Sequence, residues 1–432
     1  MTAKGLTELS VDLERLPAVE VTRMLQRLDT THAALAFRLL PKDRALEAFE
    51  DLAPSTQRAL LRGLRSEQVA ELIHDLDPDD RARLVDELPA KVATQLLSGL
   101  DPHERAMTQE LLGYPPGSAG RVMTPEVAWI PEGLDAAAGL ERLREQSFAE
   151  TIYMVPVIGL GRVLVGVVSL RSLVSAAAHT PVEDLVSAPV AVYATQDQEV
   201  AARLIRDHGM IGLPVVDAED RLLGVITVDD AMRILQEAED EDAARAGGTE
   251  PLAQGYLATP ILGVVRSRIV WLLILIAAAT LTVNVLDYFE ETLASVVSLA
   301  LFIPLLIGTG GNTGAQTVST VVRAMATDTI GVRDLPRVAG REMLTGALLG
   351  ALLAAIGFLP AALLVGRPIA FVLALALLAV CTLATTAGAV IPLLARRAGI
   401  DPAVVSAPVI TTLVDSTGLV IYFLIAHAVL GL

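Results

Sequence analysis

The chain has 432 residues, of which 53% are hydrophobic, and it carries a formal net charge of −17 and one cysteine. This balance argues against nucleic acid as a partner, because neutralising phosphates requires clustered Lys and Arg. The single cysteine excludes a disulfide framework and a thiolate metal site. The polar start of the chain predicts no signal peptide and a cytosolic N-terminus.

Residues 16–112 have the periodicity of short helices and contain a repeated motif. Each repeat places Pro just inside a helix start, and a polar or acidic turn and then apolar residues at helical spacing follow. The prolines lie about two short helices apart, at Pro54, Pro78 and Pro102. This spacing predicts stacked helical hairpins in an all-α domain over 1–120, which we interpret either as a regulatory docking domain or as a plain helical domain.

A longer repeat follows in the next part of the chain. Val-Pro-Val-Ile at 155–158 with Gly-Val-Val-Ser at 166–169 recurs as Leu-Pro-Val-Val at 213–216 with Gly-Val-Ile-Thr at 224–227. Each copy joins an amphipathic helix to two β-branched strands. Because both copies keep the same internal spacing, residues 121–236 resemble a pair of cystathionine-β-synthase (CBS) motifs with α/β structure.

CBS pairs commonly bind adenine nucleotides through an Asp that follows a Gly-x-x-Thr-x-x motif. Asp230 occupies that position after Thr227 in the second copy, whereas the first copy has Ser172. The resemblance leaves two interpretations open: an ATP site at Thr227 and Asp230, or a purely structural pair.

Residues 237–265 form an acidic linker ahead of the first long apolar run. The linker starts as a predicted helix with five carboxylates between positions 237 and 242, and Gly247 and Gly248 end this helix. A charge run of this kind is usually a solvated face. Its position also makes it a candidate mechanical link between the soluble part and the apolar part of the chain.

Residues 266–432 contain five apolar runs close to or above the roughly 20 residues that cross a bilayer. We predict spans near 269–287, 293–325, 343–365, 369–394 and 403–430. Arginines gather before the first span, between the second and third, and between the fourth and fifth. The positive-inside rule therefore predicts a multi-pass protein of the cell membrane with a cytosolic N-terminus and an outside C-terminus.

Two of these runs contain polar groups at depth. Asp415 lies near the middle of the fifth run, which has no Lys or Arg. A carboxylate there costs roughly 2.5–3.5 kcal/mol on insertion scales, so it usually faces a bundle interior or a water-filled path. The second run contains the glycine-rich stretch 308–314 with Asn312, and no Gly-Lys-Ser/Thr follows as in a phosphate loop. The glycines alone fit helix packing or a break in the helix, but with Asp415 they favour a polar pathway.

The ligand types in this pathway favour one class of ion. Oxygen ligands without Cys or clustered His suit a hard cation. One carboxylate per subunit suits hydrated Mg²⁺, and a symmetric dimer would present two copies of Asp415 to its double charge. An inside-negative potential of about 100 mV contributes about 4.6 kcal/mol to the entry of a divalent cation, so inward flow needs no ATPase.

The order of these parts resembles that of the MgtE magnesium channels over nearly the whole chain. The most specific matches are Pro304 with the stretch 308–314, and the segments 401–403 and 413–422. The resemblance implies a homodimer in a lipid membrane, with a pore on the two-fold axis between the second and fifth spans.

The resemblance also assigns roles to single residues. It implies that Asp415 selects Mg²⁺ and that Thr411, one turn earlier, offers a backbone carbonyl. Asp401 would then lie near the cytoplasmic mouth, and Asn312 supplies a further oxygen at depth.

In the family, cytosolic Mg²⁺ bridges acidic residues of the N-domain, the CBS pair and the linker helix, and it closes the pore when magnesium is plentiful. The CBS positions of that network are matched by Asp217, Glu219, Asp229 and Asp230. The chain departs from the family pattern at Ala407, where many relatives have Asn, and at 114–118 and 243–248, which are poorer in carboxylates. We therefore predict a sensor that holds fewer Mg²⁺ ions or closes the pore less tightly.

We predict a multidomain fold with an all-α helical-repeat N-domain, an α/β CBS pair and, over 266–432, a five-helix α transmembrane domain. The predicted function is a Mg²⁺-selective, Mg²⁺-gated channel for inward magnesium transport. The alternatives are a secondary divalent-cation carrier coupled to H⁺ or Na⁺, and a membrane-anchored nucleotide or ion sensor. We do not expect an enzyme, because no pair of nucleophile and base stands out.

Overall fold

The computed structural model describes residues 16–28, 30–52, 54–64, 66–86, 88–146, 149–252, 256, 259–327, 329–402 and 407–432. Residues 1–15, in which no signal peptide is predicted, and residues 403–406, at the start of the predicted fifth span, lie outside the described residues. The chain divides into two compact units. One consists of Met1–Glu239 with Ala253–Pro260, and the other of Asp240–Leu252 with Ile261–Leu432.

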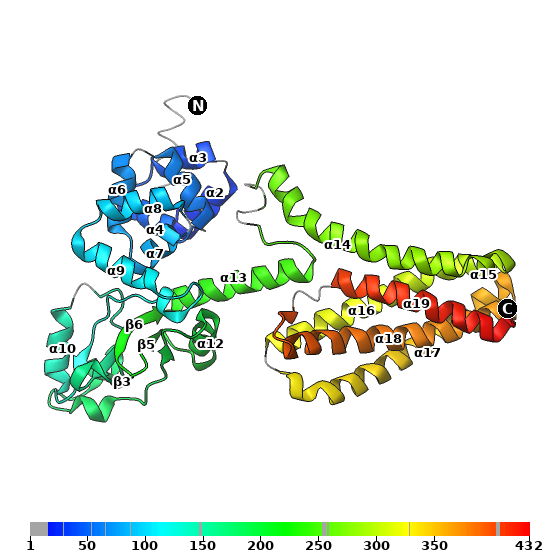
Figure 1. Cartoon of the computed structure of the whole chain (residues 1–432). Coiled ribbons are helices and arrows are strands. Elements are labelled where there is room, and N and C mark those ends of the chain that lie inside the picture. The colour runs from blue at the N-terminus through cyan, green and yellow to red at the C-terminus, as the bar shows by residue number, and fades with distance from the viewer. Residues whose placement is uncertain are drawn as a thin grey trace. The chain divides into compact units, whose positions relative to one another are not determined.

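The first unit begins with a domain of short helices (Figure 1). Their bounds are α2 Ala18–Arg27, α3 Thr30–Phe37, α4 Lys42–Glu50, α5 Pro54–Gly63, α6 Ser66–Asp75, α7 Pro78–Asp86, α8 Ala90–Gly99 and α9 Pro102–Gly113. Helices α5, α7 and α9 begin at the predicted prolines, because the missing N–H of proline is not needed in a first helical turn. Large apolar side chains from successive helices form one core, among them Leu25, Phe49, Leu52, Leu60 and Ile73. The predicted all-α N-domain is confirmed.

The second part of this unit contains two small mixed sheets. The elements are β1 Ile130–Pro131, α10 Ala136–Arg144, β2 Met154–Ile158, β3 Leu164–Ser169, α11 Leu170–Ser175, β4 Val192–Tyr193, α12 Gln198–His208, β5 Gly212–Val216, β6 Leu222–Thr227 and α13 Val228–Ala246. The strand orders are β1-β2-β3 and β4-β5-β6, with a parallel pair followed by an antiparallel pair in each sheet. This repeated topology confirms the predicted α/β CBS pair.

The two copies share even their strand register. Val157 pairs with Gly166 in the first sheet, and Val215 pairs with Gly224 in the second. Neither glycine can be replaced without a shift of its neighbours. A Cβ at Gly166 would lie 2.0 Å from Cγ1 of Val186, and one at Gly224 would lie 2.5 Å from the carbonyl oxygen of Thr124. The repeated glycine in the sequence is therefore explained by a close approach of another chain segment to each sheet.

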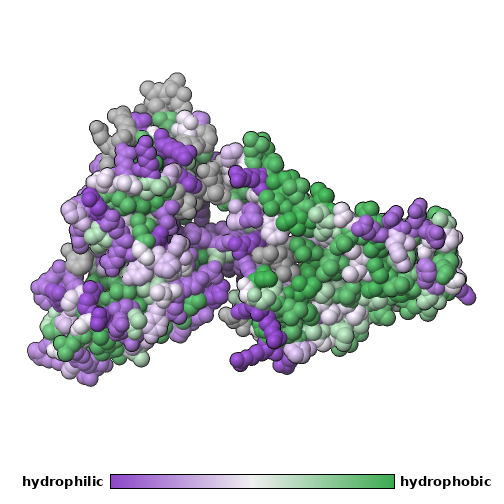
Figure 2. Space-filling model, in the orientation of Figure 1, coloured by the Kyte–Doolittle hydropathy of each residue, from purple (hydrophilic) through white to green (hydrophobic). Residues whose placement is uncertain are grey.

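The second unit consists of long apolar helices. They are α14 Ile261–Tyr288, α15 Glu290–Ser295, α16 Ile303–Ala326, α17 Leu335–Val365, α18 Arg367–Arg397 and α19 Ala407–Leu430, with a 3₁₀ turn, η4, at Val297–Phe302. Five helical stretches of the described residues are long and apolar enough to cross a membrane, as predicted. Figure 2 shows the hydrophobic surface of these helices. Within the unit, α18 is central, with 56% of its most apolar stretch buried against 6% for α14.

One expectation about the second span is wrong. The glycine-rich stretch was expected to permit a break, but α16 runs without interruption through 308–314. The glycines instead allow close helix packing. A Cβ at Gly310 would lie 2.6 Å from Cγ1 of Val380 on α18, and one at Gly314 would lie 3.0 Å from Cγ2 of Ile410 on α19. The small side chains therefore let α18 and α19 approach the backbone of α16.

Candidate ion path and cation-sensing cluster

Asp415 lies on α19 beside a helix that leaves room for it. A Cβ at Gly311 on α16 would lie 3.4 Å from Oδ1 of Asp415 and 2.6 Å from Cγ2 of Thr411. This Oδ1 atom is shielded from solvent and accepts no hydrogen bond from any described residue. A buried carboxylate oxygen without a donor is costly. The seam between α16 and α19 therefore contains an acceptor whose partner is not among the described side chains.

The other predicted pore residues take different positions. The hydroxyl group of Thr411 donates to the carbonyl oxygen of Ala407 at 2.9 Å and lies 3.4 Å from the carbonyl oxygen of Gly311. Asn312 is exposed on α16, and no hydrogen bond to Asp415 is present in the described part of the chain. The seam thus brings Thr411 and Asp415 together, whereas Asn312 faces away from the packed helices of its own unit.

Two hydrogen bonds fix the position of α19 in the bundle. Oγ of Ser416, next to Asp415, lies 2.8 Å from Oγ1 of Thr282 on α14. Further along α19, the buried hydroxyl of Tyr422 donates to the carbonyl oxygen of Leu299 at 3.0 Å. Sequence reasoning missed Thr282 and Tyr422, because their partners lie more than a hundred residues away in the chain.

Asp401 is predicted at the cytoplasmic mouth, and it is engaged by the linker. Arg245, near the end of α13, forms an ion pair with Asp401 and a second one with Glu241 on its own helix. All three side chains belong to the second unit and are partly exposed. The acidic linker thus contributes a cation to its contact with a predicted pore residue.

A group of carboxylates gathers within the first unit, where α7 packs near the start of α13. We use the term acidic cluster for Asp79, Asp80, Glu150, Asp229 and Asp230. Two sets of three ligand atoms each lie within 4.8 Å of one another: Asp79, Asp80 and Asp230 form one set, and Glu150, Asp229 and Asp230 form the other. Oδ1 of Asp79 is buried and has no hydrogen-bond partner among the described residues.

Two arginines partly neutralise the acidic cluster. Arg83 pairs with Asp80 at 2.7 Å, and Arg233 pairs with Asp230 and lies 3.7 Å from Asp80. Burial, followed by the charges of Asp230 and Asp80, raises the pKa of Asp79 well above its usual value. Burial, followed by the charge of Asp230, raises the pKa of Glu150 to about 8. The carboxylates thus still repel one another, and a hard divalent cation with oxygen ligands would relieve that repulsion.

The predicted regulatory residues are divided by the structure. Asp229 and Asp230 belong to the acidic cluster, but Asp217 and Glu219 lie in the turn between β5 and β6 and join neither set of ligand atoms. There, Asp217 accepts the backbone N–H groups of Glu219 at 3.0 Å and Arg221 at 2.8 Å. The N-domain partners Asp79 and Asp80 were missed, although two adjacent carboxylates in the first turn of a predicted helix were a visible signal.

The residues of the predicted nucleotide site contact each other. Oγ1 of Thr227 donates to Oδ2 of Asp230 at 2.7 Å, and Asp230 is only 3% exposed. Its carboxylate is thus already bound by a hydroxyl and by Arg233. The nucleotide role of this pair stays a prediction.

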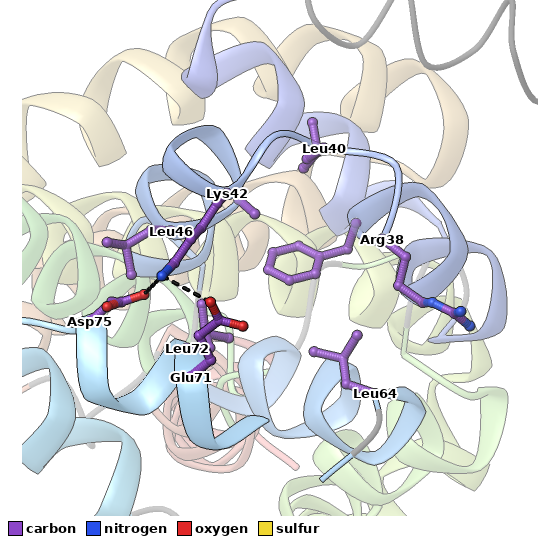
Figure 3. A pocket seen from close by; sticks show the side chains of 10 residues that line it. Arg38, Leu40, Lys42, Leu46, Leu64, Glu71, Leu72 and Asp75 are labelled. Carbon is purple, nitrogen blue, oxygen red and sulfur yellow. Dashed lines mark ion pairs between the residues drawn. The ribbon is translucent and has the colours of Figure 1, made fainter. Parts of the chain in front are cut away.

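A pocket of about 230 Å³ lies in the N-domain, apart from these sites (Figure 3). Its wall mixes apolar and charged side chains, and Lys42 reaches between Glu71 at 3.0 Å and Asp75 at 2.8 Å. Because Lys42 already pairs with both carboxylates, the pocket is a poor site for a divalent cation. We assign it no role in transport.

The chain is similar to known proteins of one family over most of its length. A family model described as a divalent cation transporter, MgtE, matches residues 303–425, the MgtE intracellular N domain matches 16–117, and the CBS domain matches 119–179 and 182–237. The magnesium transporter MgtE of Thermus thermophilus is 38% identical over 331 residues, which cover 74% of this chain and 72% of that protein. The MgtE of Bacillus subtilis is 33% identical over 74% of this chain and 71% of its own length.

A solved structure of the cytosolic domain of the Mg²⁺ channel MgtE in complex with ATP is 35% identical, with a TM-score of 0.49 over 52% of this chain and 93% of that one. A homoserine O-acetyltransferase of Methanococcoides burtonii matches only 27% of this chain and 24% of its own length, at 31% identity. This partial match gives no ground for an enzyme. On the full-length relatives and the family models together, the chain belongs to the MgtE family of divalent cation transporters.

Proposed function

We propose that the chain is a Mg²⁺-selective, Mg²⁺-gated channel that mediates inward magnesium transport across the cell membrane. The observation that carries this proposal is the orphaned Oδ1 of Asp415, buried in the seam between α16 and α19. A desolvated carboxylate inside a membrane helix is energetically unfavourable unless a cation or water binds it. The curated relatives are named as magnesium transporters, which supports Mg²⁺ as the cargo.

The ion path is proposed along the α16–α19 seam at the two-fold axis of a homodimer. Two copies of Asp415 would match the charge of Mg²⁺, which keeps most of its waters and is held through them. Thr411 would contribute its backbone carbonyl, Asn312 a side-chain oxygen, and Asp401 a carboxylate at the cytoplasmic mouth. The exposure of Asn312 supports this arrangement, because a residue lining a dimer axis is exposed in a single subunit.

The sensor is proposed at the acidic cluster. The orphaned Oδ1 of Asp79 and the short separations between the carboxylates support a site for a regulatory divalent cation. Asp79, Asp80, Asp229 and Asp230 would hold that ion, which would supply the positive charge that α7 and α13 need to pack closely. Asp217 and Glu219 are proposed as a weaker outer part of the network. ATP at Thr227 and Asp230 stays a candidate ligand.

The remaining parts follow from this arrangement. We propose a helical N-domain over 1–120, a CBS pair over 121–236, a linker over 237–265 and a pore domain over 266–432, with the N-terminus cytosolic and the C-terminus outside. The continuous α16 favours a channel over a secondary carrier, because carrier sites typically use pairs of broken helices.

The test is magnesium uptake by a transport-deficient strain that expresses the wild type, Asp415→Ala or Asp287→Ala. Asp287 lies exposed at the end of α14 and provides a matched loss of one carboxylate outside the seam. We expect Asp415→Ala to reduce uptake to the level of the empty strain and Asp287→Ala to retain it, at equal membrane expression. Normal uptake by Asp415→Ala would remove this residue from the path and refute the proposal.

A further inference from the structure

The end of the linker contacts the base of membrane helix α14 and the connection between α18 and α19. On one side, the backbone N–H of Glu250 donates to the carbonyl oxygen of Ser267 at 2.9 Å, and Nε1 of Trp271 donates to Oε1 of Glu250 at 3.0 Å, so the linker lies against the base of α14. On the other side, Arg245 forms the ion pair with Asp401, six positions before the first residue of α19, Ala407. These contacts all lie within the second unit.

The contact to Asp401 has an unusual charge arrangement for this linker. Two carboxylates, Glu241 on α13 and Asp401 in the segment before α19, share the guanidinium group of Arg245, one at each terminal nitrogen. A guanidinium group remains charged at every physiological pH, and its fork can bind two acceptors in fixed directions. A divalent cation between the same two carboxylates would also bridge them, but only at concentrations that fill the site.

We propose that Arg245 is a built-in cation that couples the linker helix to the entrance of α19 in place of a bound Mg²⁺ ion. Because the charge is covalently attached, this part of the coupling persists when cytosolic Mg²⁺ is scarce. Removal of the guanidinium group would take away the positive charge that Arg245 places between the carboxylates of Glu241 and Asp401. The coupling at this point would then depend on an added divalent cation. The effect of this contact on gating rests on the proposed channel function, whereas the contact itself does not depend on that function.

The test is amide hydrogen exchange of the full-length protein in lipid nanodiscs, measured once in EDTA and once in about 10 mM Mg²⁺, a concentration high enough to fill a weak site. In the wild type, we expect the described linker segment Asp240–Leu252 to exchange equally slowly in both conditions. In Arg245→Gln, we expect about two- to fivefold faster exchange of this segment in EDTA, the range for a partly exposed ion pair, and recovery in Mg²⁺.

Three further variants make the result specific. The charge exchange Arg245→Asp with Asp401→Arg should keep the segment slow in EDTA, and Asp401→Asn should accelerate it as Arg245→Gln does. Arg203→Gln is the matched control, because it breaks a comparable partly exposed pair with Glu199, 2.9 Å long, on α12 of the first unit. It should leave the linker segment unchanged.

An equal exchange rate of the linker segment in wild type and Arg245→Gln in EDTA would overturn the inference. So would a wild-type segment that becomes slow only when Mg²⁺ is added. A magnesium-uptake assay on Asp415→Ala separates this outcome from a failure of the proposed function. If the channel function is wrong, Asp415→Ala transports normally whatever the exchange data show.

Discussion

The acidic cluster of the first unit and the α16–α19 seam of the second share one feature and differ in everything around it. Each contains a buried carboxylate oxygen without a partner among the described residues, on Asp79 and on Asp415. In the cluster, other carboxylates and two arginines surround the orphaned oxygen. In the seam, Gly311 and Thr411 lie beside it, and no ion pair to Asp415 is present in the described part of the chain.

On the proposed function, the two regions would handle the same kind of ion in two different ways. Several convergent carboxylates hold a cation tightly and make local packing depend on it, which suits a sensor. A single carboxylate beside small residues holds a hydrated cation weakly, which suits conduction, because an ion must also leave its site. If the two regions have separate functions, a substitution in one region should leave the function of the other unchanged.

The largest effect is expected in the seam. Gly311→Ala adds a Cβ 2.6 Å from Cγ2 of Thr411, so α19 must shift beside Asp415. We expect magnesium uptake to fall about tenfold or more, since overpacking of this kind typically costs roughly 1–3 kcal/mol. The measurement is uptake at equal membrane expression.

The control is Gly340→Ala on α17, outside the seam, where a Cβ meets nothing within 4 Å. It should transport normally. Equal uptake by the two variants would show that the close α16–α19 contact is not needed for transport.

The effect of intermediate size is expected in the first unit, where the substitution changes the free energy of unfolding and not magnesium uptake. Gly224→Ala adds a Cβ 2.5 Å from the carbonyl oxygen of Thr124, a backbone atom that cannot easily move. We expect the free energy of unfolding of the first unit to fall by roughly 1–3 kcal/mol. Urea unfolding of the full-length protein, followed on the first unit, measures it. Gly99→Ala, with open space at its Cβ, should be neutral. An unchanged midpoint for Gly224→Ala would refute this account of the repeated glycine.

The smallest effect concerns the hydrogen bond between α14 and α19. Thr282→Val removes the partner of Ser416 Oγ, which retains a second acceptor in the carbonyl oxygen of Thr412 at 3.2 Å. We expect the packing of α19 against α14 to be destabilised by about 0.5–1.5 kcal/mol, and magnesium uptake to fall by less than about tenfold. Thr280→Val is the control, because its hydroxyl bonds only to Ala277 on its own helix, at 2.6 Å. Equal uptake in both variants would contradict a positioning role for Thr282.

The sequence was sufficient for features that depend on a single stretch of chain. Five apolar runs predict five helices whatever their packing, and a lone carboxylate such as Asp415 stands out inside one of them. The two CBS copies were recognisable because Gly166 and Gly224 keep the same spacing to their strands. Proline at a helix start located the repeats of the N-domain for the same local reason.

Features that depend on packing could not be predicted. Asp79 lies about 150 residues before Asp230, so only the folded unit shows that their carboxylates meet. The ion pair between Arg245 and Asp401 joins residues 156 positions apart. The glycines of 308–314 were correctly associated with close packing but wrongly with a break, since glycine permits both and the neighbouring helices decide between them.

The central claim is that conduction depends on Asp415 and sensing on the acidic cluster. The most direct test compares Asp415→Asn and Asp79→Asn in purified, reconstituted protein, with Mg²⁺ flux into proteoliposomes and Mg²⁺-induced thermal stabilisation measured on the same samples. The account predicts that Asp415→Asn loses flux and keeps the stabilisation, whereas Asp79→Asn keeps flux and loses most of the stabilisation. Loss of flux in Asp79→Asn together with normal flux in Asp415→Asn would contradict it.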